Sequence, residues 1–287
     1  MHDLIIRGGT LVDGTGAAAR VADVAISNGV VTEVGTVSGA AKREIDASGH
    51  VVTPGWVDIH THYDGQATWD PLITPSCWHG VTTVVMGNCG VGFAPARPDK
   101  HDWLIELMEG VEDIPGAALA EGIKWGWETF PEYLDSLDSQ KRVLDIATQV
   151  PHGSVRAYVM GDRGARNEAA TPEDVTAMAK IVREGVEAGA LGFSTSRTML
   201  HLSKDGVPVP GTFANKEELM GIGRALGQAG HGVFEMASDM TPAEDEFMWM
   251  KELSAETGLP VTYALLQSPV DSEKWRDMLA LTDQARK

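Results

Sequence analysis

Two histidines at the end of a short apolar run are the residues best suited to chemistry. His60 and His62 follow Trp56-Val57-Asp58-Ile59, a run that predicts a buried strand ending at a site. Side chains two residues apart on a strand point the same way, so both imidazoles are expected to face one pocket. Neutral imidazole is the commonest protein ligand for zinc-like ions. Taken alone, however, such a pair is more often a hydrogen-bonded strand end than a metal site.

A cysteine follows the next apolar run of the chain. Asn88-Cys89-Gly90 comes just after Val81–Met86, which also predicts a strand, so the thiol is expected at the same edge as the histidines. A thiolate binds zinc, and Gly87 and Gly90 would let the backbone bring the sulfur close. The alternative is that Cys89 is a small buried apolar residue, as most free cysteines are.

The elements that must position these residues fall into two parts. Residues 4 to 53 alternate short β-rich runs with turn signals, and Asn28-Gly29 predicts a type I′ hairpin. From residue 55 onward strands alternate with helical stretches, which indicates βα units and a parallel sheet. We expect strands near 55–60, 81–86, 153–160, 190–194, 231–236 and 260–266. We expect helices near 101–109, 128–138, 139–149, 172–188, 215–229 and 244–257, the fourth starting at Thr171-Pro172.

The bulk properties exclude several classes of function. The chain has 23 Lys and Arg against 41 Asp and Glu, a formal net charge of -18, which repels nucleic acids and anionic membranes. No apolar run is long enough to span a bilayer, and the N-terminus has no secretory signal pattern. The two cysteines are too few for a disulfide scaffold. We therefore expect a cytoplasmic protein that acts on a small molecule.

Several sequence blocks resemble one enzyme family. Pro54-Gly55-x-x-Asp58-x-His60-x-His62, after an N-terminal segment with Arg7-Gly8-Gly9-Thr10, is similar to the amidohydrolase superfamily. Three further blocks resemble its N-acyl-D-amino-acid deacylase (D-aminoacylase) branch: Trp69-Asp70-Pro71, His79 to Gly90, and Gly189 to Ser196. The resemblance is strong as far as about Gly211.

The resemblance implies an α/β fold with a partial TIM-like (β/α)8 barrel preceded by a small β-sandwich segment. Residues 1–54 would form part of the sandwich and residues 55–287 the barrel. A (β/α)8 barrel closes with eight strands, and only six are expected here. We therefore expect the chain to be the N-terminal part of a longer one, with the family's catalytic aspartate beyond residue 287.

The metal site that the resemblance implies is incomplete in this sequence. Relatives of this type bind zinc through the cysteine matching Cys89 and through histidines after the fifth and sixth strands. Ala237 and Leu265 stand at those two histidine positions. Glu235, two residues before Ala237, shares its face of the strand and would be a substitute ligand, and Asp239 is the next candidate. A buried carboxylate paired to a basic side chain explains Glu235 equally well.

The leading hypothesis is a hydrolase of non-peptide carbon-nitrogen bonds that uses one or two divalent ions, with zinc expected. His60, His62, Cys89 and Glu235 would bind metal, and an N-acyl amino acid or related amide would be the substrate. Arg197, after the fourth strand, would bind a substrate carboxylate, or else form a salt bridge that braces a loop. The alternative is a barrel that has lost its ligand histidines and binds a small molecule without efficient catalysis.

Overall fold

The computed structural model describes residues 1–267 and 271–285 and divides the chain into two compact units, Met1–Trp56 and Val57–Lys287. The smaller unit is a five-stranded sheet in the order β3-β2-β1-β4, with β5 also paired to β1. Its strands are β1 (His2–Leu11), β2 (Arg20–Ser27), β3 (Val30–Gly35), β4 (Ala41–Asp46) and β5 (Val51–Val52). Pairs β1-β2 and β2-β3 are antiparallel, and β4 and β5 run parallel to β1.

The hairpin predicted between β2 and β3 is confirmed. Ser27 pairs with Val30, which leaves two residues in the turn. Asn28 has φ 54° and Gly29 has φ 76°, and two consecutive positive φ angles are what a type I′ turn requires.

The larger unit is built on a six-stranded sheet in the order β11-β10-β9-β8-β7-β6. The four pairs from β7 to β11 are parallel, and the sheet curves into half of a barrel, which confirms the expected partial TIM-like fold. Its strands are β6 (Trp56–Asp58), β7 (Val81–Met86), β8 (Asp145–Pro151), β9 (Gly192–Arg197), β10 (Val233–Ser238) and β11 (Val261–Tyr263).

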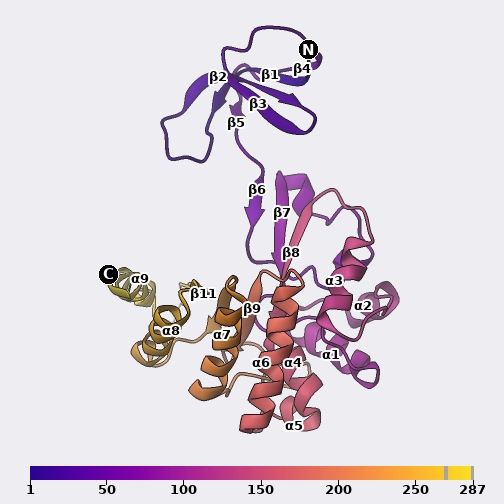
Figure 1. Cartoon of the computed structure of the whole chain (residues 1–287), viewed down its shortest axis with the longest axis vertical. Helices are drawn as coiled ribbons and strands as arrows, with labels where there is room; N and C mark the ends of the chain where they lie inside the picture. The colour runs from indigo at the N-terminus through magenta and orange to yellow at the C-terminus, as the bar shows by residue number, and fades with distance from the viewer. Residues whose placement is uncertain (268–270, 286–287) are drawn as a thin grey trace. The chain divides into compact units, whose positions relative to one another are not determined.

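Helices connect these strands and follow one another in chain order, as the colour sequence in Figure 1 shows. The contacts of α6 with α7 and of α7 with α8 make this a continuous layer. The helices are α1 (His101–Glu112), α2 (Gly116–Gly122), α3 (Phe130–Asp138), α4 (His152–Met160), α5 (Asp162–Ala165), α6 (Pro172–Glu187), α7 (Lys216–Ala229), α8 (Ala243–Thr257) and α9 (Lys274–Ala285). None of the helices in the described ranges is long and apolar enough to cross a membrane.

Two neighbouring sequence predictions were wrong. Residues 139–149 were expected as a helix, but β8 occupies Asp145–Pro151 and pairs with both β7 and β9. Residues 153–160 were expected as a strand, but they lie in α4. Most residues of α4 are buried, including His152, Ser154 and Arg156, so the segment lacks the amphipathic periodicity by which a surface helix is recognised.

The core of the larger unit lies between the sheet and the helices. Phe193 of β9 and Phe234 of β10 are almost fully buried and pack with ring centroids 5.1 Å apart. Adjacent residues of a strand point to opposite faces. The next residues, Ser194 and Glu235, therefore face the inside of the half-barrel, where the polar site is expected.

Helix α6 begins with a capping box that offers a stability test. The Thr171 hydroxyl accepts from the Asp174 backbone N–H, and the Asp174 carboxylate accepts from the Thr171 N–H. We expect Thr171→Ala to lower the free energy of unfolding by about 1 kcal/mol, because it leaves a helix N–H without its acceptor. Chemical denaturation would measure the loss. Thr171→Ser keeps the hydroxyl and is the control; equal stability of the two variants would contradict the prediction.

Candidate metal centre

The structure brings His60, His62 and Cys89 together at the ends of β6 and β7. One ligand atom from each lies within 4.8 Å of the other two. The distance from His60 Nε2 to Cys89 Sγ is 3.1 Å, and the two imidazole rings meet edge to face with centroids 5.4 Å apart. Two imidazoles and a thiol form a donor set that suits a zinc-like ion.

A tightly packed turn presents the cysteine. Cys89 has φ 56° and lies between Gly87 (φ 73°) and Gly90 (φ 68°), so three residues of the turn are in the left-handed region. The Ser194 hydroxyl of β9 donates to Gly87 O and accepts from Gly90 N–H, the latter at 3.0 Å. Ser194 is more than 100 residues from this turn in the sequence, and β9 is separated from β7 by one strand, β8. A distant segment of the chain therefore fixes the turn.

Asn88 links this turn to the end of β6. Its side-chain amide donates to Thr61 O at 3.1 Å and to Val85 O at 2.9 Å, and its oxygen accepts from Gln149 Nε2 at 2.7 Å. Thr61 lies between the two histidines, so the same buried amide holds both the histidine segment and the cysteine turn. This preorganises the three candidate ligands.

Glu235 lies beside the same group. Its Oε2 accepts from the Cys89 backbone N–H at 3.1 Å, and its Oε1 is 4.0 Å from His60 Nδ1. Oε1 is buried and has no hydrogen-bond partner within the described residues. Burial raises the pKa of Glu235 to about 7, although the Cys89 N–H opposes this. An unsatisfied buried carboxylate oxygen next to three possible ligands suits the binding of a cation.

The electrostatics of the other groups also suit a cation. Burial lowers the pKa of His60, and burial together with the neighbouring His60 and His201 lowers the pKa of His62 to about 3. Both rings are therefore neutral and able to ligate near pH 7. Burial, and then the Glu235 charge, raises the pKa of the Cys89 thiol; a bound divalent ion reverses that effect by stabilising the thiolate.

Two acidic residues near this group were missed by sequence reasoning. Glu112, the last residue of α1, has Oε1 3.3 Å from His62 Nε2, and burial raises its pKa to about 7. Asp64 is 1 % exposed and its Oδ2 has no partner in the described chain; burial likewise raises its pKa to about 7. Asp64 lies in the same block as His60 and His62, which was an available signal, whereas nothing in the sequence around Glu112 indicates a site.

Three further positions were singled out in the sequence: Ala237, Leu265 and Asp239. Ala237 is buried and aligns with Ser196 in the β9-β10 pair, whereas Leu265 follows β11 and is 40 % exposed. Asp239, the second candidate substitute ligand, accepts from the Thr198 hydroxyl and from Met199 N–H at 2.9 Å. Its carboxylate therefore braces the loop after β9.

Arg197 is already paired. Its guanidinium makes a bidentate contact with Glu246 of α8, with Nη2 to Oε1 at 2.8 Å and Nε to Oε2 at 3.1 Å, and it also donates to Ala214 O. This is the loop-bracing salt bridge that the sequence left open as the alternative. A substrate-binding role for Arg197 stays a prediction.

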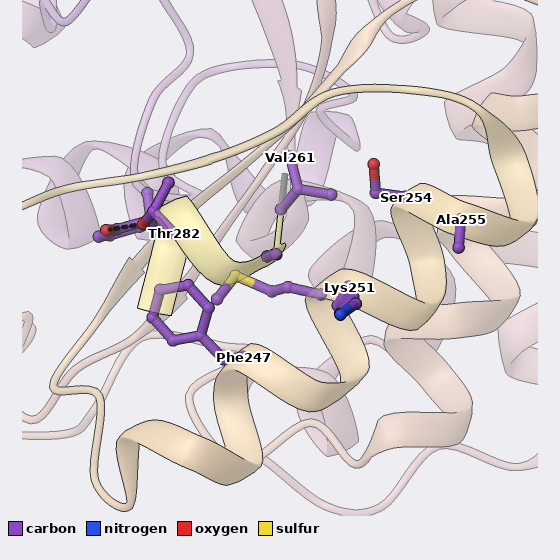
Figure 2. A pocket seen from close by; sticks show the side chains of 9 residues that line it. Phe247, Lys251, Ser254, Ala255, Val261 and Thr282 are labelled. Carbon is purple, nitrogen blue, oxygen red and sulfur yellow. Dashed lines mark hydrogen bonds between the residues drawn. The ribbon is translucent and has the colours of Figure 1, made fainter. Parts of the chain in front are cut away.

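A separate cavity lies away from the histidines and carries no comparable chemistry. It has a volume of about 320 Å³ and lies between α8, β11 and α9. Figure 2 shows Phe247, Val261 and Thr282 around it, with Lys251 at its side. Its lining contains no histidine, cysteine or acid among the described residues, so the His60-His62-Cys89 group is the better candidate for catalysis.

Comparison with known proteins identifies relatives of this chain. A profile of the amidohydrolase family matches residues 43–287. The chain is 36% identical over 194 residues to a D-aminoacylase of Alcaligenes xylosoxydans xylosoxydans, an alignment that covers 67% of this chain and 37% of that protein. It is 31% identical over 230 residues to an N-acyl-D-glutamate deacylase of the same organism, covering 79% of this chain and 42% of the relative.

Solved structures of a D-aminoacylase and an N-acyl-D-glutamate deacylase superpose on this chain. A D-aminoacylase described with a binuclear metal centre superposes with TM-score 0.79 at 30% identity, covering all of this chain and 56% of the other. An N-acyl-D-glutamate deacylase from Bordetella bronchiseptica, in complex with zinc and a phosphonate inhibitor, gives TM-score 0.72 at 28% identity and the same 56%. The chain thus spans about half the length of these solved relatives. The profile match over most of the sequence, and identity above 30% across two thirds of it, show that the chain belongs to the amidohydrolase family.

Proposed function

We propose that this chain is part of a zinc-dependent hydrolase that cleaves the amide bond of N-acyl-D-amino acids. The observation that carries the proposal is the group His60, His62 and Cys89, whose ligand atoms lie within 4.8 Å of one another. The related deacylases act, by their names, on N-acyl-D-glutamate and N-acyl-D-aspartate. These relatives support the substrate class, and the N-acyl-D-glutamate deacylase structure solved with zinc supports the metal.

Each of the residues around the candidate metal centre would have its own role. His60 and His62 would bind zinc as neutral imidazoles, Cys89 as a thiolate, and Glu235 through its unsatisfied Oε1. Zinc bound there would act as a Lewis acid toward the amide and activate water for attack. Glu112, in contact with His62, would fix the orientation of that ring, since ligand histidines commonly use their second nitrogen in this way.

The experiment measures metal and activity together. The full-length protein, purified without added metal, is expected to contain zinc by elemental analysis and to hydrolyse N-acetyl-D-amino acids faster than their L enantiomers. In the His60→Ala/His62→Ala double variant we expect both zinc and hydrolysis to be lost. His79→Ala, an exposed histidine on a turn before β7, is the matched control and is expected to keep both.

One observation favours a second candidate, a binding protein without efficient catalysis. Ala237 and Leu265 replace two expected ligand histidines, and a site with fewer ligands can hold metal weakly. Zinc binding by the full-length protein without hydrolysis of any acylated amino acid would support this alternative. A well-folded protein that contains no metal would contradict the proposed hydrolase.

A further inference from the structure

The β9-β10 pair shows which residue lies beside the missing histidine. Ala237 of β10 is paired in register with Ser196 of β9. Side chains paired in this way on parallel strands point to the same face of the sheet. The Ser196 side chain therefore lies next to the space that a histidine at position 237 would enter.

The imidazole of His201 lies next to the Ser196 side chain. His201, in the loop after β9, has its Nδ1 2.9 Å from Ser196 Oγ. Its backbone carbonyl accepts from Val209 N–H at 3.2 Å, so both the ring and the main chain are anchored. Although it lies in a loop, His201 is partly buried.

The ring lies near two of the candidate ligands, His60 and His62. Burial and then the neighbouring His60 lower the pKa of His201, and His201 in turn contributes to the lowered pKa of His62. The three imidazoles therefore lie close enough for their charges to interact. This agrees with the strand register, which puts Ser196 on the inner face.

The hydrogen bonding of His201 resembles that of a metal ligand. Ligand histidines bind the ion through one ring nitrogen, while a second group fixes the other nitrogen. Ser196 fixes Nδ1, and no group in residues 1–267 and 271–285 hydrogen-bonds to Nε2. His201 lies outside the tight group of three ligands, so a bound ion is expected to draw its ring inward.

We propose that His201 supplies the imidazole that Ala237 cannot, so that this one ligand comes from the loop after β9 and not from position 237 of β10. Ser196 is a positioning residue that orients the ring. The small side chain at position 237 is then what makes room for His201. This inference rests on the proposed metal site at His60, His62 and Cys89.

Zinc affinity in solution tests the inference without relying on activity. The dissociation constant would be measured in the purified protein by competition with a chromophoric chelator, and the visible spectrum of the cobalt-substituted protein would report the ligand set. His201→Ala is expected to weaken zinc binding on the order of 100-fold and to alter the cobalt spectrum. Adding Ala237→His to that variant is expected to restore most of the affinity.

Controls separate this inference from the proposed function. His231→Ala removes an exposed histidine just before β10 and is expected to bind zinc like the parent. Unchanged affinity in His201→Ala would overturn the inference and leave the proposed function standing. Weakened binding that Ala237→His fails to restore would also overturn it, because His201 would then not replace that histidine. A folded parent that binds no zinc would overturn both proposals.

Discussion

Gly87→Ala is expected to destabilise the protein and to remove its metal. A Cβ at position 87 would lie 2.2 Å from Gln149 O and 2.9 Å from Gln149 N, at φ 73°. These are backbone atoms of the neighbouring strand β8, so no side chain can rotate away to make room. We expect a loss of at least about 3 kcal/mol in the free energy of unfolding, measured by chemical denaturation, and zinc content near zero by elemental analysis.

Gly230→Ala is the matched control. Gly230 caps α7 at φ 78°, but a Cβ there meets no heavy atom within 4 Å. That substitution therefore costs only the left-handed strain, about 1 kcal/mol. If Gly87→Ala were as stable as Gly230→Ala and kept its zinc, the turn that presents Cys89 would not be the rigid element described here.

The parts of the fold that the sequence predicts well are those with local signals. The Asn28-Gly29 hairpin and the start of α6 at Pro172 both agree with the structure, because turn and cap chemistry depends on neighbouring residues. The segment 145–160 was assigned wrongly because its helix is buried on most sides. Its polar residues serve tertiary contacts: His152 pairs with Glu218 of α7 at 2.9 Å.

In the candidate site, too, the residues with local sequence signals were predicted and those placed by tertiary contacts were not. His60, His62 and Cys89 were predicted from strand ends and family blocks, and the structure brings them together. Glu112 and Ser194 could not be predicted as neighbours of these residues, because only tertiary packing brings α1 and β9 to the site. A short motif therefore locates the candidate ligands, while the groups that orient them come from distant elements.

Replacing the Glu235 carboxylate by an amide tests whether its negative charge contributes to metal binding. Glu235→Gln keeps an oxygen that can accept from the Cys89 N–H but loses the negative charge. If the carboxylate binds the ion, this variant is expected to remain folded while its zinc affinity falls on the order of 100-fold, measured by chelator competition. Glu244→Gln, at an exposed acid in the first turn of α8, is the control and is expected to bind zinc like the parent.

Glu235→Leu tests the second contact of the same side chain. It removes the acceptor of the buried Cys89 N–H, and an unsatisfied buried donor costs about 1–3 kcal/mol. We therefore expect Glu235→Leu to lose stability as well as zinc, whereas Glu235→Gln loses zinc alone. Normal zinc affinity in Glu235→Gln would show that the carboxylate only braces the cysteine turn. The metal would then be bound without it, and the unsatisfied Oε1 would need another explanation.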